Sequence, residues 1–194
     1  MLSDIRPAIV STGLFTVLLG LLYPLTITGV AKLAFPYQAE GSLIRDRSGQ
    51  VVGSALIAQG FGKDEYLRPR PSAAGYDAAA SGGSNYGPLS ADLAKRIKGD
   101  AASLRASTGH DEIPDDAVTA SGSGLDPDIS PAYALLQADR IAKTRGVSAD
   151  QVRQIIAAHV EQPALGFLGQ PRVNVLMTNR ALDAALPKGS AKAS

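Results

Sequence analysis

The hydrophobic residues of this chain are concentrated in one long segment near the N-terminus. From Pro7 to Ala31 there is no charged residue, and Arg6 and Lys32 flank the run. A helix of this length, rising about 1.5 Å per residue, exceeds the roughly 30 Å hydrocarbon core of a bilayer. Because the run is longer than the apolar part of a signal peptide and has no polar face, it predicts a transmembrane helix rather than a cleaved leader or a buried soluble helix.

This segment carries candidate residues for packing against another helix. Gly13, Thr16 and Gly20 are spaced three and four residues apart, so they share one helix face, where small side chains allow a second helix to approach closely. The alternative is that the glycines simply face lipid. Pro24 has no N–H for the carbonyl of Gly20, and its ring crowds that carbonyl, so we expect a kink there.

Beyond the segment, short apolar runs alternate with Gly/Pro turns, as expected for one mixed α/β (α+β) soluble domain behind a single N-terminal transmembrane helix. Capping signals mark helix starts at Ser90, Ser130 and Ser148, and Gly146 marks a helix end. The predicted strands are 42–45, 51–57, 117–120 and 173–177, and the predicted helices are 91–105, 131–145, 149–160 and a short one containing Leu182 and Leu186.

The chain as a whole is expected to divide into four segments. We expect an N-terminal tail at 1–6, the transmembrane helix at 7–35, the soluble domain at 36–187 and a disordered tail at 188–194.

Composition removes several classes of function. The chain has 194 residues, a net charge of +1 and no cysteine, which excludes disulfides, thiolate catalysis and cysteine-ligated metals. The balanced charge gives no argument for nucleic-acid binding. Arg6 precedes the apolar segment while Lys32, Arg45 and Arg47 follow it. Large domains are translocated largely regardless of such charges, so the side of the membrane stays open at this point.

One glycine-rich stretch resembles a phosphate-binding loop only in part. Gly82 and Gly87 have the right separation, but Pro88 and Leu89 replace the lysine and hydroxyl residue that contact phosphate and magnesium. Two interpretations stay open: the backbone N–H groups before the Ser90 helix bind an anion, or the loop packs internally or against a partner. We find no nucleophile paired with a base, no metal-ligand set and no Asp-Lys-Thr-Gly-Thr phosphorylation motif. The sequence therefore predicts neither catalytic nor metal residues, and it excludes the catalytic subunit of a P-type pump.

Many short motifs, in order along nearly the whole chain, resemble one family. They are Arg6-Pro7-Ala8, Tyr23-Pro24-Leu25, Gly41-Ser42-Leu43-Ile44, Gly53-Ser54-Ala55-Leu56-Ile57, Arg70-Pro71-Ser72-Ala73, Ala80-Ser81-Gly82-Gly83-Ser84-Asn85, Val118-Thr119-Ala120-Ser121-Gly122-Ser123-Gly124-Leu125-Asp126, Ile129-Ser130-Pro131, Gln137 with Arg140, and Gly169-Gln170-Pro171 with Val173-Asn174. The chain resembles the KdpC family, whose members belong to the Kdp potassium-transporting P-type ATPase.

The resemblance implies a single-span protein of the bacterial inner membrane, with residues 1–6 in the cytoplasm and 36–187 outside. The implied partners are a channel-like potassium-binding subunit, a P-type ATPase subunit and a small single-span subunit; ATP, magnesium and potassium would act at those partners. The implied role is non-catalytic assembly and stabilisation of a high-affinity potassium uptake complex. The alternative is a nucleotide-binding co-catalyst that raises the ATP affinity of the ATPase subunit. The residues implied for a partner or nucleotide loop are Ser81, Gly82, Gly83, Ser84, Asn85, Gln137 and Arg140. Because a domain outside the membrane meets almost no ATP, we favour assembly.

Overall fold

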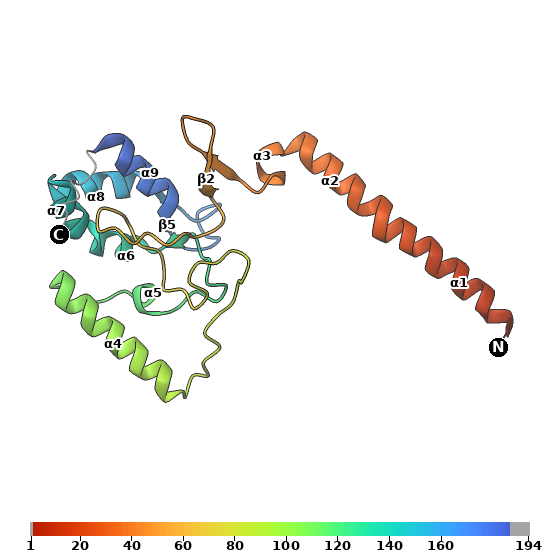
Figure 1. Ribbon diagram of the computed structural model, residues 1–194, viewed down its shortest axis with the longest axis horizontal. Helices are drawn as coiled ribbons and strands as arrows, with labels where there is room; N and C mark the ends of the chain where they lie inside the picture. Colours follow the sequence, from red (N-terminus) through yellow and green to blue (C-terminus); the bar gives the residue numbers. More distant parts are fainter. Residues whose placement is uncertain (1, 187–194) are drawn as a thin grey trace. The chain divides into compact units, whose positions relative to one another are not determined.

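The computed structural model describes residues 2–186. The disordered tail predicted at 188–194 lies outside the described residues. The chain divides into two compact units after Ser54, and each is described by itself (Figure 1).

The first unit is dominated by one long helical stretch, drawn in red and orange in Figure 1. It comprises α1 (Leu2–Val17), a π-helical turn η1 (Leu18–Leu22) and α2 (Tyr23–Ala34). Residues Ser3–Ala34 are long and apolar enough to cross a membrane, with a mean hydropathy of 1.9 and 0% of the most apolar window buried. The predicted long apolar helix is thus confirmed.

The helix is irregular just before Pro24, the residue at which we predict a kink. The N–H of Tyr23 bonds to the carbonyl of Leu18, five residues back, instead of four. A π-helical turn of this kind takes up the steric conflict that proline creates inside a helix. The structure therefore places a widened turn immediately N-terminal to Pro24.

A short helix and a hairpin complete the first unit. They are α3 (Pro36–Ala39), β1 (Leu43–Arg45) and β2 (Val51–Ser54). The strands pair antiparallel, with Leu43 opposite Ser54 and a bulge between Ile44 and Arg45. The Asp46 carboxylate closes the turn by accepting hydrogen bonds from the backbone N–H groups of Ser48 and Gln50, at 2.8 and 2.9 Å. The predicted hairpin is confirmed, although β2 ends at Ser54 rather than Ile57.

The second unit combines helices with a small antiparallel sheet, as the predicted fold class requires. Its elements are α4 (Ala91–Thr108), α5 (Asp115–Val118), β3 (Asp128–Ile129), α6 (Pro131–Leu136), α7 (Ala138–Arg145), α8 (Ala149–Ala158), β4 (Val160–Glu161), β5 (Arg172–Asn174) and α9 (Val175–Ala185). The sheet order is β3-β5-β4, and Val173 in the central strand pairs with both Ile129 and Val160.

The core of this unit lies between the sheet and helices α6 to α9. Apolar residues four apart face inward: Val152 and Ile156 on α8 are fully buried, as are Ile141 on α7, Val173 on β5 and Leu182 on α9. This spacing places side chains on one helix face and so produces a continuous apolar stripe. In contrast, α4 has no fully buried residue.

The local capping predictions are confirmed. The Ser90 hydroxyl accepts a hydrogen bond from the Leu93 N–H at the start of α4. Ser148 and Gln151 form the full capping box of α8. Gly146 ends α7 in the left-handed conformation that glycine adopts without strain. The predicted helix 131–145 is present but divides at Gln137 into α6 and α7.

Two predicted strands are wrong wholly or in part. Residues 117–120 do not form a strand: Ala117 and Val118 belong to the helical turn α5, which two aspartates in its first turn favour electrostatically. The strand predicted at 173–177 ends at Asn174, because the Asn174 side chain accepts a hydrogen bond from the Met177 N–H and caps α9. Ala117 and Val118 are buried, as are Val173, Val175 and Leu176, whereas Met177 is exposed. A short buried run has the same pattern in a strand and a helix.

Candidate functional site

The glycine-rich loop that suggested phosphate binding packs against another loop of small residues, Ser121-Gly122-Ser123-Gly124. We call residues 72–83 and 121–124 the paired loops. The Gly82 N–H donates to the Ser123 carbonyl at 2.8 Å, and the Ser81 hydroxyl donates to the same oxygen at 3.0 Å. A Cβ atom on Gly83 would lie 2.8 Å from the Gly122 carbonyl oxygen. Glycine is therefore needed here so that two backbones can touch.

Gly124 makes the contact tighter still. Its φ of +71° is in the left-handed region, and a Cβ there would lie 2.8 Å from both the Ala74 Cβ and the Gly82 carbonyl oxygen. The Ser72 hydroxyl donates to the Gly124 carbonyl at 2.7 Å. Of the remaining candidates in this loop, Ser84 is half-buried, while Asn85 is exposed with a φ of 53°.

Gln137 and Arg140 do come together, but they bind another segment, residues 64–68, which we call the strap. The Gln137 side chain accepts from the Arg68 N–H at 2.8 Å and donates to the Arg68 carbonyl at 3.1 Å. Arg140 donates to the carbonyls of Asp64 and Tyr66, at 2.6 and 3.0 Å, and to the Gln137 side-chain oxygen at 2.8 Å. Within residues 2–186, none of the hydrogen bonds of this pair reaches residues 81–85.

The environment of Arg140 fits a structural role. Burial, followed by the nearby charge of Arg68, lowers the pKa of Arg140 to about 10. The guanidinium therefore still carries its positive charge at neutral pH. The strap carbonyls and the carboxylate of Asp64, 3.7 Å away, balance this charge.

Sequence reasoning missed two further residues that hold the strap. The Asn179 amide accepts from the Leu67 N–H at 2.7 Å and donates to the Leu67 carbonyl at 2.9 Å. The fully buried side chain of Arg145 donates to the Glu65 carbonyl at 2.9 Å and pairs with Asp183 at 2.8 Å. The sequence does contain one indication of both residues: each is a polar residue on an otherwise apolar helix face. A polar side chain buried on such a face needs a defined hydrogen-bond partner.

Tyr66 completes this network. Its hydroxyl donates to the Asp183 carboxylate at 3.0 Å, and the Arg145 guanidinium lies 5.3 Å from the centre of its ring. Burial first, and then the hydrogen bond to Asp183, raises the pKa of Tyr66 to about 12. The phenol is thus a neutral donor at physiological pH, and the strap is held by charges and amides instead of by neighbouring strands.

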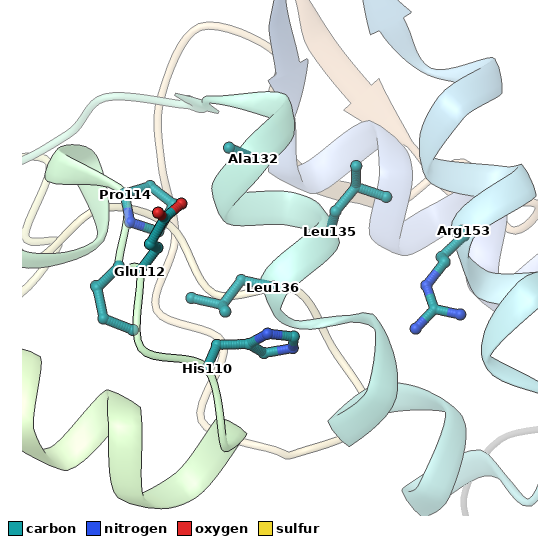
Figure 2. A pocket seen from close by; sticks show the side chains of 8 residues that line it. His110, Glu112, Pro114, Ala132, Leu135, Leu136 and Arg153 are labelled. Carbon is teal, nitrogen blue, oxygen red and sulfur yellow. The ribbon is translucent and has the colours of Figure 1, made fainter.

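A cavity of about 540 Å³ lies between the α4–α5 connection, α6 and α8 (Figure 2). Glu112 and Pro114 line one side and Arg153 the other, with Leu135 and Leu136 of α6 between them. Arg153 is already paired with Asp139 at 2.6 Å and with Asp150 at 3.0 Å. This cavity brings together none of the candidate residues from the sequence.

The four candidate helix-packing residues all lie on exposed positions of the long helix. A Cβ added at Gly13 or at Gly20 would meet nothing within 4 Å. Thr16 and Pro24 are exposed as well. The chain itself therefore does not need small residues here for its own packing.

The most exposed apolar cluster of the second unit lies on the loop between β4 and β5; we call residues 163–169 the apolar hairpin. Leu165, Phe167 and Leu168 are 85%, 75% and 62% exposed. Ala164 and Leu168 exchange two backbone hydrogen bonds, at 3.1 and 2.9 Å, so the loop has a defined conformation. From Gln162 to Pro171 there is no charged residue. Exposed clusters of this kind mark interaction sites.

These features define a class: a single-span membrane protein that carries one small, internally braced α/β domain with an exposed apolar hairpin. The family model described as "K+-transporting ATPase, c chain" (KdpC) matches residues 5–184. The chain belongs to the KdpC family and is a subunit of a potassium-transporting ATPase.

Similar proteins agree over almost the full length. The Potassium-transporting ATPase KdpC subunit of Caulobacter vibrioides (strain NA1000 / CB15N) is 66% identical over 189 residues, covering 96% of each chain. The proteins of the same name from Caulobacter sp. (strain K31) and Beijerinckia indica subsp. indica are 64% and 58% identical, again with 96% of each chain covered. The family predicted from the motifs is thus confirmed.

Proposed function

We propose that this chain is a non-catalytic subunit that assembles and stabilises the potassium-binding and ATPase subunits of a high-affinity potassium uptake complex. The observation that carries the proposal is the apolar hairpin. Leu165, Phe167 and Leu168 are held outward on a hydrogen-bonded turn. Covering such side chains is favourable by roughly 25 cal/mol for each Å² of apolar surface removed from water. A partner subunit that covers them gains this energy without first ordering a flexible loop.

The long helix supplies the second contact in this proposal. Its Gly13, Thr16 and Gly20 face packs against the potassium-binding subunit, with the small single-span subunit as a further neighbour. The N-terminus lies in the cytoplasm of an inner membrane and residues 36–187 lie outside. A reporter fused to the C-terminus tests this orientation, because activity of the reporter in the cytoplasm would contradict it.

The alternative, a nucleotide-binding co-catalyst, has less support. Gly82, whose N–H would face phosphate, already donates to Ser123. Gln137 and Arg140 are occupied by the strap. A ligand stabilises the fold that binds it. If ATP at millimolar concentration raises the unfolding temperature of the full chain, the nucleotide-binding role is favoured over the assembly role.

The hairpin is tested by replacing Leu165, Phe167 and Leu168 with Ser. Since all three are exposed, the unfolding temperature of the chain should stay the same, while recovery of the other subunits by co-purification should fall at least about tenfold. Leu89→Ser is the matched control, because Leu89 is 98% exposed but lies away from the hairpin in sequence. Full recovery with the triple variant, or equal loss with Leu89→Ser, would overturn the proposed role of the hairpin.

A further inference from the structure

The widened turn in the membrane helix leaves two backbone carbonyls without their usual donors. The carbonyl of Gly20 would normally accept from residue 24, which is Pro24 and has no N–H. The carbonyl of Leu19 would normally accept from Tyr23, but the Tyr23 N–H is directed to Leu18. The two differ at the next position: the residue five after Leu19 is again Pro24, so neither the α-helical nor the π-helical pattern gives the Leu19 carbonyl a donor, whereas the residue five after Gly20 is Leu25, which has an N–H.

Side chains of the same helix do not replace these donors. Thr26 is the first serine or threonine after Gly20, and its Oγ1 donates to the Leu22 carbonyl at 2.7 Å. Thr16 lies one turn before Gly20, and helical side chains point further toward the N-terminus, away from this carbonyl. The residues between them, apart from Tyr23 and Pro24, are apolar or glycine.

The missing hydrogen-bond donor matters because of where the turn lies along the membrane span. Leu19 and Gly20 lie near the middle of the apolar stretch Ser3–Ala34. Hydrocarbon offers no donor, so an unpaired backbone group at this depth has to find one on protein or water. Gly20 leaves the site accessible, since a Cβ there would meet no atom within 4 Å.

We infer that the carbonyl of Leu19 accepts a hydrogen bond from a side-chain hydroxyl or amide on a transmembrane helix of the potassium-binding subunit. The inference rests on the proposed packing of this helix in the complex, and it adds the chemistry of the contact. Gly20 allows the partner helix to approach, and the turn before Pro24 supplies the acceptor. Interhelical hydrogen bonds of this kind contribute modestly to association and favour one register.

Photo-crosslinking in the assembled complex identifies the partner residue. A benzophenone amino acid is placed at Leu21 or Leu22, beside Gly20 but outside the proposed contact, and the crosslinked peptide is mapped by mass spectrometry. We expect a partner helix with a donor side chain within one turn of the crosslink. If the complex assembles but the crosslinked segment contains only apolar residues, the inference is wrong while the assembly function stands. If no partner is crosslinked and the subunits do not co-purify, the proposed function itself fails.

A matched pair of substitutions tests the acceptor. Pro24→Ala restores an N–H at residue 24 and lets the turn return to the α-helical pattern, in which the Tyr23 N–H bonds to the Leu19 carbonyl. The partner's donor then loses its acceptor, and we expect about fivefold weaker retention of the chain in the purified complex. Pro7→Ala is the control, because Pro7 is also inside a helix but near the polar end, where water supplies donors. Unchanged retention with Pro24→Ala, or equal loss in both variants, would overturn the inference, because retention would then not depend on the acceptor before Pro24.

Discussion

The irregular segments of the domain contact their surroundings in two opposite ways. In the paired loops and the strap, backbone and polar groups bind other parts of the same chain: Gly82 binds Ser123, and Asn179 holds Leu67. In the apolar hairpin, the backbone bonds are local and the large side chains point to solvent, with Leu165 85% exposed. The first region is completed within the chain, whereas the second presents a surface that the chain leaves uncovered.

This difference shows why a prominent motif is a poor guide to the binding surface. The Ser-Gly-Gly-Ser stretch stands out in the sequence because tight backbone packing admits only small residues, and Gly83 and Gly124 have no room for a Cβ. The hairpin looks like an ordinary apolar run, and only the exposure of its side chains distinguishes it from core. The comparison predicts that changes in the first region reduce stability and that changes in the second reduce assembly.

The largest loss of stability should come from Asn179→Ala. The substitution leaves the N–H and the carbonyl of Leu67, a fully buried residue, without partners. At about 1 to 3 kcal/mol for each buried group, we expect a loss of about 4 kcal/mol in the free energy of unfolding, measured by denaturant titration of the full chain in detergent. Gln154→Ala, which removes an exposed amide on α8, should change it by less than about 0.5 kcal/mol. A loss below about 1 kcal/mol for Asn179→Ala would contradict the proposed bracing of the strap.

The strap also marks the limit of what the sequence could predict. The transmembrane helix, the caps at Ser90 and Ser148 and the helix end at Gly146 were predictable, because each depends on residues adjacent in sequence. The Leu67–Asn179 contact joins positions 112 residues apart, which no local pattern reports. Strands β3 and β4 are too short to show an alternating pattern and exist because β5 pairs with them.

The candidate site was predictable to a lesser degree. The motifs identified Ser81–Asn85, Gln137 and Arg140. The glycine of this stretch that the contact between the two loops requires is Gly83, whereas a Cβ on Gly87, which completes the phosphate-like spacing, would meet nothing within 4 Å. Whether these residues contact a partner stays a prediction. The buried Arg145 and Asn179 are polar residues on apolar helix faces, and their role depends on a strap that lies far away in the sequence.

A smaller loss should follow from Gly124→Ala in the paired loops. The new Cβ meets the Ala74 Cβ and the Gly82 carbonyl oxygen at 2.8 Å, and the φ of +71° disfavours alanine. Together, strain and displacement should cost about 2 to 3 kcal/mol, visible as a lower denaturant midpoint. Gly122→Ala is the matched control: its Cβ meets nothing within 4 Å, so we expect a change within about 0.5 kcal/mol. Equal stability of the two variants would mean that the loops do not depend on close contact.

The smallest effect on stability, and the sharpest contrast, should come from Leu165→Gly in the hairpin. Leu165 has a φ of +56°, a conformation that favours glycine, yet it carries a large side chain that touches solvent. Relief of strain and the greater freedom of glycine in the unfolded chain should nearly cancel, leaving the free energy of unfolding within about 0.5 kcal/mol. Tyr76→Gly is the comparison, because Tyr76 has a similar φ of +62° but its hydroxyl donates to the Arg70 carbonyl at 2.9 Å. That variant should lose stability, whereas Leu165→Gly should keep its stability and reduce co-purification of the other subunits. The reverse outcome would mean that the strained leucine serves the fold of the domain, and the distinction between the two regions would not hold.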